Sequence, residues 1–164
     1  MRILVTAGPT REHIDAVRFI TNASSGRMGG AVARAAINAG HDVSLLLGPC
    51  PAEPPDGCEI VRFTTAADLK RELAARFEAC DALVMAAAVG DFTLEAPAAD
   101  KLRRSAGPVE LRMVPTEDVL AGIAAGRRGV LSARGLDLDD TIFSILTFDS
   151  GVVSCLENSW WVPE

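Results

Sequence analysis

Short apolar segments alternate with helix-like segments along the first half of the chain, and this alternation constrains the fold more than any other feature. Four apolar runs have the length of strands, at residues 2–6, 42–47, 59–63 and 82–88. Two longer segments carry apolar side chains at helical spacing, at residues 26–38 and 66–79. Strands that alternate with helices form a parallel sheet that is covered on both faces. We therefore predict an α/β fold, with a Rossmann-like, doubly wound, mainly parallel sheet and helices on both faces.

The pattern of the chain changes after Gly107. Residues 110–114 favour a further strand, and residues 116–125 favour a helix with Thr116 as its N-cap. Acidic residues follow Thr116 directly, where they suit the first turn of a helix.

The last part of the chain has the pattern of an antiparallel β-hairpin. Two alternating apolar segments, residues 141–148 and 152–158, flank an Asp-Ser-Gly turn. We predict a core over residues 1–128, to which a C-terminal β-hairpin segment is appended over residues 129–164.

Charge and composition exclude several classes of protein. The formal net charge of −6 argues against general binding of nucleic acid, which requires clustered positive charge. No segment is long and apolar enough to span a bilayer, and the N-terminus lacks a signal-peptide pattern. The four cysteines form no CxxC pair, and no histidine lies near them at metal-ligand spacing. We expect a cytoplasmic protein with no nucleic-acid partner, no membrane contact and no protein metal site.

The segment from Ser24 to Gly30, at the head of the first long helix, is the first candidate for chemistry. Free amides at a helix N-terminus bind phosphate with the help of the helix dipole, and glycine lets a ligand approach the backbone. Ser24 and Ser25 also suit N-cap positions, and Arg27 adds charge. The segment is neither GxGxxG nor a Walker A sequence. An ordinary capped helix that packs closely through Gly29 and Gly30 explains it equally well.

A long polar loop precedes this helix and carries Arg11, Asp15, Arg18 and Asn22. The loop is longer than a common βα connection, and long loops at the carboxyl end of a parallel strand usually carry function. A solvated, charged loop with a short helix over residues 14–19 is the alternative.

Two later segments offer small and basic residues. The small side chains of residues 86–91 leave room for a flat ring or a ribose, and Asp91 suits the binding of hydroxyl groups or an amine. Lys101, Arg103 and Arg104 place three cations within four residues, which would steady a triphosphate and the charge of a transferring phosphoryl group. The alternatives are a strand packed under a helix and a solvated basic turn.

Together these segments resemble the phosphopantothenoylcysteine synthetase family over about residues 1–125. The opening of that family is similar to residues 6–12, 14–15, 17–22 and 24–29 of this chain. Three later family segments, of the types AAAVADY, KxKK and LxxxPTPDIL, are similar to residues 86–91, 101–104 and 111–118.

The resemblance implies a ligase of coenzyme A biosynthesis. In the family, a carboxylate of 4′-phosphopantothenate attacks the α-phosphate of CTP in the presence of Mg²⁺, and pyrophosphate leaves. The amine of L-cysteine then attacks the acyl-cytidylate, which gives 4′-phosphopantothenoylcysteine and CMP. The resemblance also implies a homodimer. No flavin is expected on this chain, because it starts at the synthetase and not at the flavin-dependent decarboxylase to which many bacterial members are fused.

Position in the matching motifs implies a role for individual residues. Asn22 would handle the acyl-cytidylate, because a carboxamide both donates and accepts hydrogen bonds. Lys101 would supply a point charge for the phosphates or the leaving group, so these two residues are the implied catalytic residues. The implied substrate- and nucleotide-binding residues are Gly8, Arg11, Arg18, Ser24, Ser25, Gly26, Arg27, Gly29, Ala87, Ala88, Asp91, Arg103 and Arg104.

The sequence departs from the family after residue 125, where the family's nucleotide-base segment is not recognisable. Residues 137–163 instead resemble a segment of the C-terminal sheet of the glucose-fructose oxidoreductase/inositol dehydrogenase family, which would supply two strands and no cofactor site. Two other functions stay open. An NAD(P)-binding oxidoreductase fits the Rossmann-like start but lacks GxGxxG and an acidic residue after the second strand, and a non-catalytic nucleotide-binding module fits the same segments.

Overall fold

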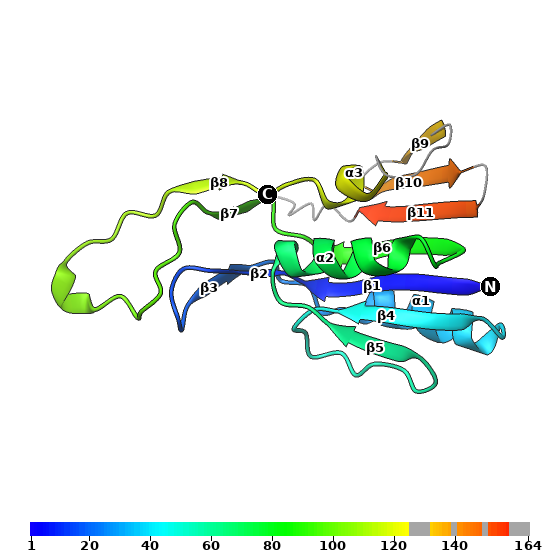
Figure 1. The fold of residues 1–164 in the computed structure, drawn as a ribbon, viewed down its shortest axis with the longest axis horizontal. Helices are drawn as coiled ribbons and strands as arrows, with labels where there is room; N and C mark the ends of the chain where they lie inside the picture. The colour runs from blue at the N-terminus through cyan, green and yellow to red at the C-terminus, as the bar shows by residue number, and fades with distance from the viewer. Residues whose placement is uncertain (125–131, 139–140, 149–150, 158–164) are drawn as a thin grey trace.

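The computed structural model describes residues 1–124, 132–138, 141–148 and 151–157. Four parallel strands form its centre (Figure 1): β1 (Arg2–Pro9), β4 (Asp42–Leu47), β5 (Glu59–Arg62) and β6 (Ala82–Ala88). They lie in the order β5-β4-β1-β6, so the chain first runs outward to one side of β1 and then crosses to the other. The predicted Rossmann-like parallel sheet is confirmed, and all four predicted strands are present.

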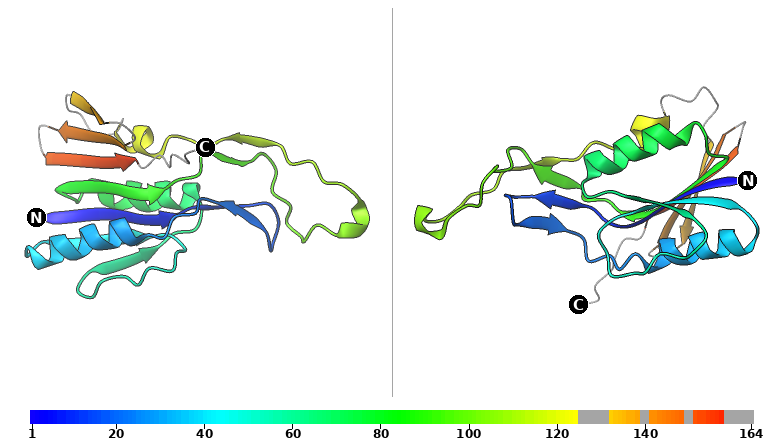
Figure 2. Two further views of the ribbon diagram at one scale, coloured as in Figure 1. Left: turned by 180° about the vertical axis from the view of Figure 1, so that it is seen from behind. Right: turned by 60° about the horizontal axis from the view of Figure 1, so that its bottom comes forward.

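Two long helices cover opposite faces of this sheet (Figure 2): α1 (Arg27–Asn38) and α2 (Ala66–Phe77). Successive residues of a strand point to opposite faces, and β1 uses this alternation directly. Leu4 lies in one buried cluster with Leu73 of α2, whereas Val5 lies in a second cluster with Ala33 of α1. Both faces of the sheet are therefore buried at β1, which explains its apolar sequence, whereas the edge strand β5 is largely exposed.

Three further strands extend the sheet beyond β6: β9 (Ser132–Leu138), β10 (Thr141–Phe148) and β11 (Gly151–Glu157). β10 pairs antiparallel with β9 and with β11, which confirms the predicted hairpin. β11 pairs parallel with β6, from Val153 opposite Leu83 to Cys155 opposite Met85, so the hairpin continues the central sheet. The predicted division between residues 128 and 129 lies outside the described residues and stays a prediction.

Two antiparallel arms project from the carboxyl ends of β1 and β6 (Figures 1 and 2). The first arm, residues 11–21, pairs β2 (Arg11–His13) with β3 (Phe19–Thr21). The second arm, residues 92–115, pairs β7 (Phe92–Leu94) with β8 (Met113–Pro115), and its long connection contains the 3-10 helix η1 (Arg104–Ala106). The first arm replaces the short helix that was the alternative for residues 14–19.

The last described helix, α3 (Val119–Ala124), packs against α2 and buries Val119 and Ile123 in the same cluster as Leu73. The predicted N-cap at Thr116 is wrong. Asp118 is the capping residue, because its carboxylate accepts a hydrogen bond of 2.8 Å from the amide of Ala121 in the first turn of α3. None of the helices in the described part of the chain combines the length and the apolar character needed to cross a bilayer.

Candidate functional site

The start of α1 lies against the carboxyl end of β1, where the predicted phosphate-binding residues are found. Gly8 and Gly26 both have positive φ angles, of 80° and 74°, which glycine adopts without strain. Gly26 is the N-cap of α1, and no side chain makes a capping hydrogen bond there, so the prediction of Ser24 or Ser25 as N-cap is wrong. Both hydroxyls instead accept long hydrogen bonds close to the helix start. Ser24 accepts from the Gly26 amide at 3.4 Å, and Ser25 accepts from the Arg27 amide at 3.5 Å.

Gly29 has a packing role at this helix start. A methyl group on Gly29 would overlap Cβ of Ala7 and lie 2.7 Å from the carbonyl oxygen of Thr6. The helix therefore touches the strand directly at Gly29, as the alternative of a closely packed helix expected. A methyl group on Gly30 would meet nothing within 4 Å among the described residues, so close packing through Gly30 is not found. Arg27 is the first residue of α1 and is exposed, so its charge is available to a ligand.

Asn22 links the loop before α1 to the segment after β6. Its Nδ2 donates a hydrogen bond of 3.0 Å to the carbonyl oxygen of Val89, and the side chain is exposed. The predicted catalytic amide thus lies beside the predicted nucleotide-binding segment that contains Ala87, Ala88 and Asp91. No residue in the described part of the chain donates to its Oδ1, so that oxygen can accept a hydrogen bond from a ligand.

Hydrogen bonds from β1 and the loop after it fix the end of β6. The hydroxyl of Thr6 accepts from the amides of Ala86 and Ala87 at 3.0 Å, and the amide of Thr10 donates to the carbonyl oxygen of Ala88 at 3.1 Å. These two polar groups of the Ala87-Ala88 backbone are already paired within the fold. The exposed carboxylate of Asp91 is a polar group of this segment that a ligand can reach.

Two threonines to which the motifs gave no binding role hold the turn at Gly90. The buried hydroxyl of Thr10 accepts from the Gly90 amide at 2.9 Å. The hydroxyl of Thr116 donates to the Gly90 carbonyl oxygen at 2.6 Å, and the Thr116 amide donates to the carbonyl oxygen of Asp91 at 2.9 Å. Each of these threonines follows a proline in the sequence, and neither is adjacent to a glycine, so no local pattern reveals these contacts.

Arg11 lies at the base of the first arm. Its guanidinium stacks on the ring of Phe19 at 4.4 Å, and its amide donates to Thr64 at 2.7 Å. The Nε of Arg11 is the one buried side-chain nitrogen or oxygen without a hydrogen-bond partner in the described part of the chain. Arg11 is thus held against Phe19 of the first arm.

The basic run lies on the outer end of the second arm and not beside α1. Lys101, Arg103 and Arg104 are exposed, and with Arg18 they line an open recess on the long connection between β7 and β8. Figures 1 and 2 show that this connection extends well beyond the sheet. Within one chain, most of the predicted residues therefore form two groups, one at the carboxyl ends of β1 and β6 and the start of α1, and one at the tips of the arms.

Asp15 joins the tips of the two arms. Its side chain is fully buried and forms an ion pair of 3.0 Å with Arg18. The pKa of Asp15 lies below its ordinary value, although burial alone would raise it. The lowering comes from hydrogen bonds donated by the amides of Val17, Leu102 and Arg18 and from the Arg18 charge.

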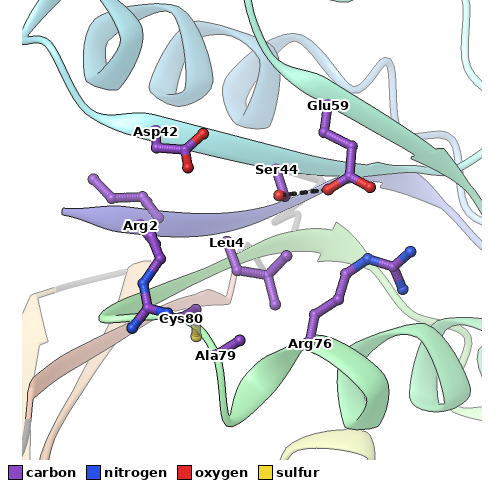
Figure 3. Close-up of a pocket in the computed structure, with 9 residues that line it drawn as sticks. Arg2, Leu4, Asp42, Ser44, Glu59, Arg76, Ala79 and Cys80 are labelled. Atoms are coloured by element: carbon purple, nitrogen blue, oxygen red, sulfur yellow. Dashed lines mark hydrogen bonds between the residues drawn. The ribbon is translucent and has the colours of Figure 1, made fainter.

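A separate pocket of about 190 Å³ lies at the amino ends of β1 and β4 (Figure 3). Its lining includes Arg2, Ser44, Glu59 and Arg76, and none of the predicted site residues. Ser44 donates to Glu59 at 2.7 Å, while Arg2 and Arg76 form ion pairs with acidic residues outside the lining. The carboxyl edge of the sheet therefore remains the candidate site.

Comparison with known proteins shows the family to which the chain belongs. A family described as "DNA/pantothenate metabolism flavoprotein C-terminal domain" matches residues 1–132. The chain is 42% identical over 125 residues to the coenzyme A biosynthesis bifunctional protein CoaBC of Vibrio parahaemolyticus. The aligned region covers 75% of this chain and 31% of that protein. It is 40% identical over 144 residues to a cysteine/cysteine sulfinic acid decarboxylase of an unknown prokaryotic organism, over 86% of this chain and 40% of that protein.

Solved structures with a similar fold include a domain of a CoaBC protein. The crystal structure of the C-terminal domain of a CoaBC protein superposes with a TM-score of 0.66 at 26% identity, over 96% of this chain and 88% of that chain. This chain spans less than half the length of the two longer relatives. The matched residues contain the helix start, Asn22, the segment after β6 and the basic run, and the chain belongs to the phosphopantothenoylcysteine synthetase family, that of the DNA/pantothenate metabolism flavoprotein C-terminal domain.

Proposed function

We propose that this chain is the ligase unit of a phosphopantothenate–cysteine ligase in coenzyme A biosynthesis. The observation that carries the proposal is the hydrogen bond from Asn22 to Val89, which places the amide beside the segment after β6. That segment, the start of α1 and Asn22 all lie at the carboxyl edge of β1 and β6, where open α/β sheets bind their ligands.

The proposed reaction has two steps. A carboxylate oxygen of 4′-phosphopantothenate forms a bond to the α-phosphorus of CTP, and the bond from that phosphorus to pyrophosphate breaks. The amine of L-cysteine then bonds to the acyl carbon and loses a proton, and CMP leaves with the electrons of the broken acyl–oxygen bond. Mg²⁺ enters with the triphosphate, because Mg²⁺ commonly binds through substrate phosphates.

Each group of residues has a part in this scheme. The amides at the start of α1, with Ser24, Ser25 and Arg27, hold phosphate. Asn22 accepts or donates around the mixed anhydride while its Nδ2 stays oriented by Val89. Lys101 neutralises charge on the phosphates or on the leaving pyrophosphate.

The test of this proposal is a product analysis. The purified chain is mixed with 4′-phosphopantothenate, Mg²⁺ and either CTP or ATP, with and without L-cysteine, and pyrophosphate and products are followed by mass spectrometry. We expect phosphopantothenate-dependent pyrophosphate release with CTP, and amide product only when cysteine is added. A folded chain that binds CTP and releases no pyrophosphate would support the non-catalytic nucleotide-binding module instead.

We further propose that the working unit is a homodimer in which an arm of one copy reaches the other copy. Exposed apolar side chains gather on the two arms, each exposed by 39% to 57%: Val17, Phe19, Phe92, Val109, Leu111 and Met113. Such surfaces on a small protein favour association. A second copy would also bring a basic run to a helix start, which one chain alone keeps apart.

A complementation experiment tests this arrangement. Asn22→Asp and Lys101→Gln chains, each inactive alone, are mixed after mild dissociation. Random pairing makes half of the dimers mixed, and each mixed dimer has one intact site if Lys101 acts on the partner's helix start. We expect recovery of about a quarter of the wild-type rate. A mixture that forms dimers and stays inactive would show that Lys101 acts within its own chain.

A further inference from the structure

Asp15 is a buried carboxylate to which the proposed reaction assigns no role. Its residue is 1% exposed, and its side chain has no exposed surface. A charge that is removed from water needs several strong partners, so the identity of those partners shows what the charge stabilises.

The partners of Asp15 come from two distant segments. The amides of Val17 and Arg18 donate to its Oδ1 at 2.8 Å each, which fixes the turn of the first arm. Its Oδ2 accepts from the amide of Leu102 at 3.1 Å, across 87 residues of sequence, and pairs with Arg18 at 3.0 Å. One carboxylate therefore holds both the tip of the first arm and the middle of the basic run.

Arg18 completes the hold on Leu102. Its Nη2 donates to the carbonyl oxygen of Leu102 at 2.9 Å. The N–H and the C=O of Leu102 belong to the two peptide groups on either side of that residue, so both peptide groups are fixed. These peptide groups join Leu102 to Lys101 and to Arg103, which are the cations of the run.

Few other contacts in the described part of the chain hold this run in place. The Ala98 amide donates to the carbonyl oxygen of Ile14 at 2.9 Å, three residues before Lys101. None of the ion pairs among the described residues includes Lys101, Arg103 or Arg104. The backbone of the run thus depends on Asp15 and Arg18, while its basic side chains stay available to an anion.

We propose that Asp15 is a positioning residue of the ligase, which acts through Leu102 and Arg18 to present Lys101 to the phosphates. The proposal rests on the ligase function proposed above. The Asp15 side chain is fully buried, so it acts on the reaction only through the residues that it holds. Displacing a catalytic group by about 1 Å can lower the rate about 10²-fold, so the hold on Leu102 matters for turnover.

The first test follows the Leu102 amide directly, without any need for activity. Hydrogen exchange in the wild-type chain should be slower at the Leu102 amide than at neighbouring amides of the exposed run. Asp15→Asn keeps the size of the side chain but gives one acceptor oxygen in place of two, so exchange at Leu102 and tryptic cleavage after Lys101 should both become faster. A Leu102 amide that exchanges at the same rate in both proteins would overturn the proposal.

The second test measures turnover. For Asp15→Asn we expect kcat to fall about 10²-fold while the KM for CTP changes by less than about twofold. Asp81→Asn is the matched control, because Asp81 also accepts from a backbone amide and pairs with an arginine, but at the opposite edge of the sheet. The control should keep the wild-type kcat, and an equal loss in both variants would overturn the proposal.

A double-mutant cycle identifies the residue through which Asp15 acts. If Asp15 acts through Lys101, then Asp15→Asn should lower kcat by less than about twofold in a Lys101→Gln background. A full additional loss would overturn this route. If Asp15→Asn does not fold, Arg18→Lys serves as second variant, because it keeps the charge but cannot keep both contacts at once.

The two proposals fail in distinguishable ways. A folded wild-type chain that releases no pyrophosphate refutes the ligase function, and the Leu102 exchange measurement still decides whether Asp15 holds the basic run. An active wild-type chain with an unchanged Asp15→Asn variant refutes only the positioning role.

Discussion

Replacing Asn22 by aspartate tests the part of the site that the structure defines best. The Nδ2 of Asn22 donates to the carbonyl oxygen of Val89 at 3.0 Å, within the ordinary range of such a bond. In Asn22→Asp, a carboxylate oxygen takes the place of the Nδ2 donor and faces the carbonyl oxygen of Val89. Because two acceptors repel each other, we expect the charged side chain to turn toward solvent. The lost bond is worth about 0.5–1.5 kcal/mol at most, and the exposed position makes the change in folding stability smaller.

The effect on turnover should be far larger than the effect on folding. Removing one oriented group that stabilises developing charge costs about 10²–10³-fold in kcat. We therefore expect Asn22→Asp to lose turnover by that factor, while CTP binds with nearly wild-type affinity through the start of α1. Pyrophosphate release gives the rate, and isothermal titration calorimetry gives the affinity for CTP.

Asn38→Asp is the matched control for this change, because Asn38 is the last residue of α1 and lies at the other end of that helix. The control should keep the wild-type rate. If Asn22→Asp turned over within about threefold of wild type, less than the loss expected from an oriented group, the assignment of Asn22 to the reaction would be wrong.

Two further predictions concern the frame of the site. Gly29→Ala should lower the free energy of unfolding by about 1–3 kcal/mol in urea, because the new methyl group meets the Thr6 carbonyl oxygen, whereas Gly30→Ala has open space and should not be destabilised. A Gly29→Ala chain as stable as Gly30→Ala would contradict the close contact of helix and strand. The hydrogen bonds from Arg2 lower the pKa of Asp81 to about 2. The contribution of this ion pair to the free energy of unfolding is therefore present above a pH of about 4 and is lost as the pH falls toward 2. Urea unfolding of Asp81→Asn between these pH values should therefore depend less on pH than that of the wild type, and equal slopes would refute it.

Much of the fold could be predicted because the inner strands β1 and β4 are largely buried and β6 is apolar along its whole length. The predicted bounds of β4 and β6 agree with the structure residue for residue, since continuous apolar runs mark buried parallel strands. The arms could not be predicted in this way, because β2, β3, β7 and β8 are three residues long each. Their shape depends on contacts such as that of Thr116 with Gly90, which no local pattern reveals.

The candidate site was predictable to a similar degree. Asn22 and the segment after β6 meet in the structure, as the motifs implied. The basic run does not join them within one chain, because its place is set by the contact of Asp15 with Leu102, far apart in the sequence. Neither the spacing of the cations nor their charge contains that information.

The parallel pairing of β11 with β6 has a consequence for the order of folding. Hairpins such as β10 and β11 close through local contacts within microseconds, whereas parallel pairing of distant segments is slow because a long loop must close first. The contact of Leu83 with Val153 is therefore expected to form late, after the hairpin already exists. Until β11 pairs with β6, the side of β6 that faces it has unpaired backbone groups, which strands of other chains can bind. A slower pairing of β11 with β6 should therefore increase the aggregation of newly made protein.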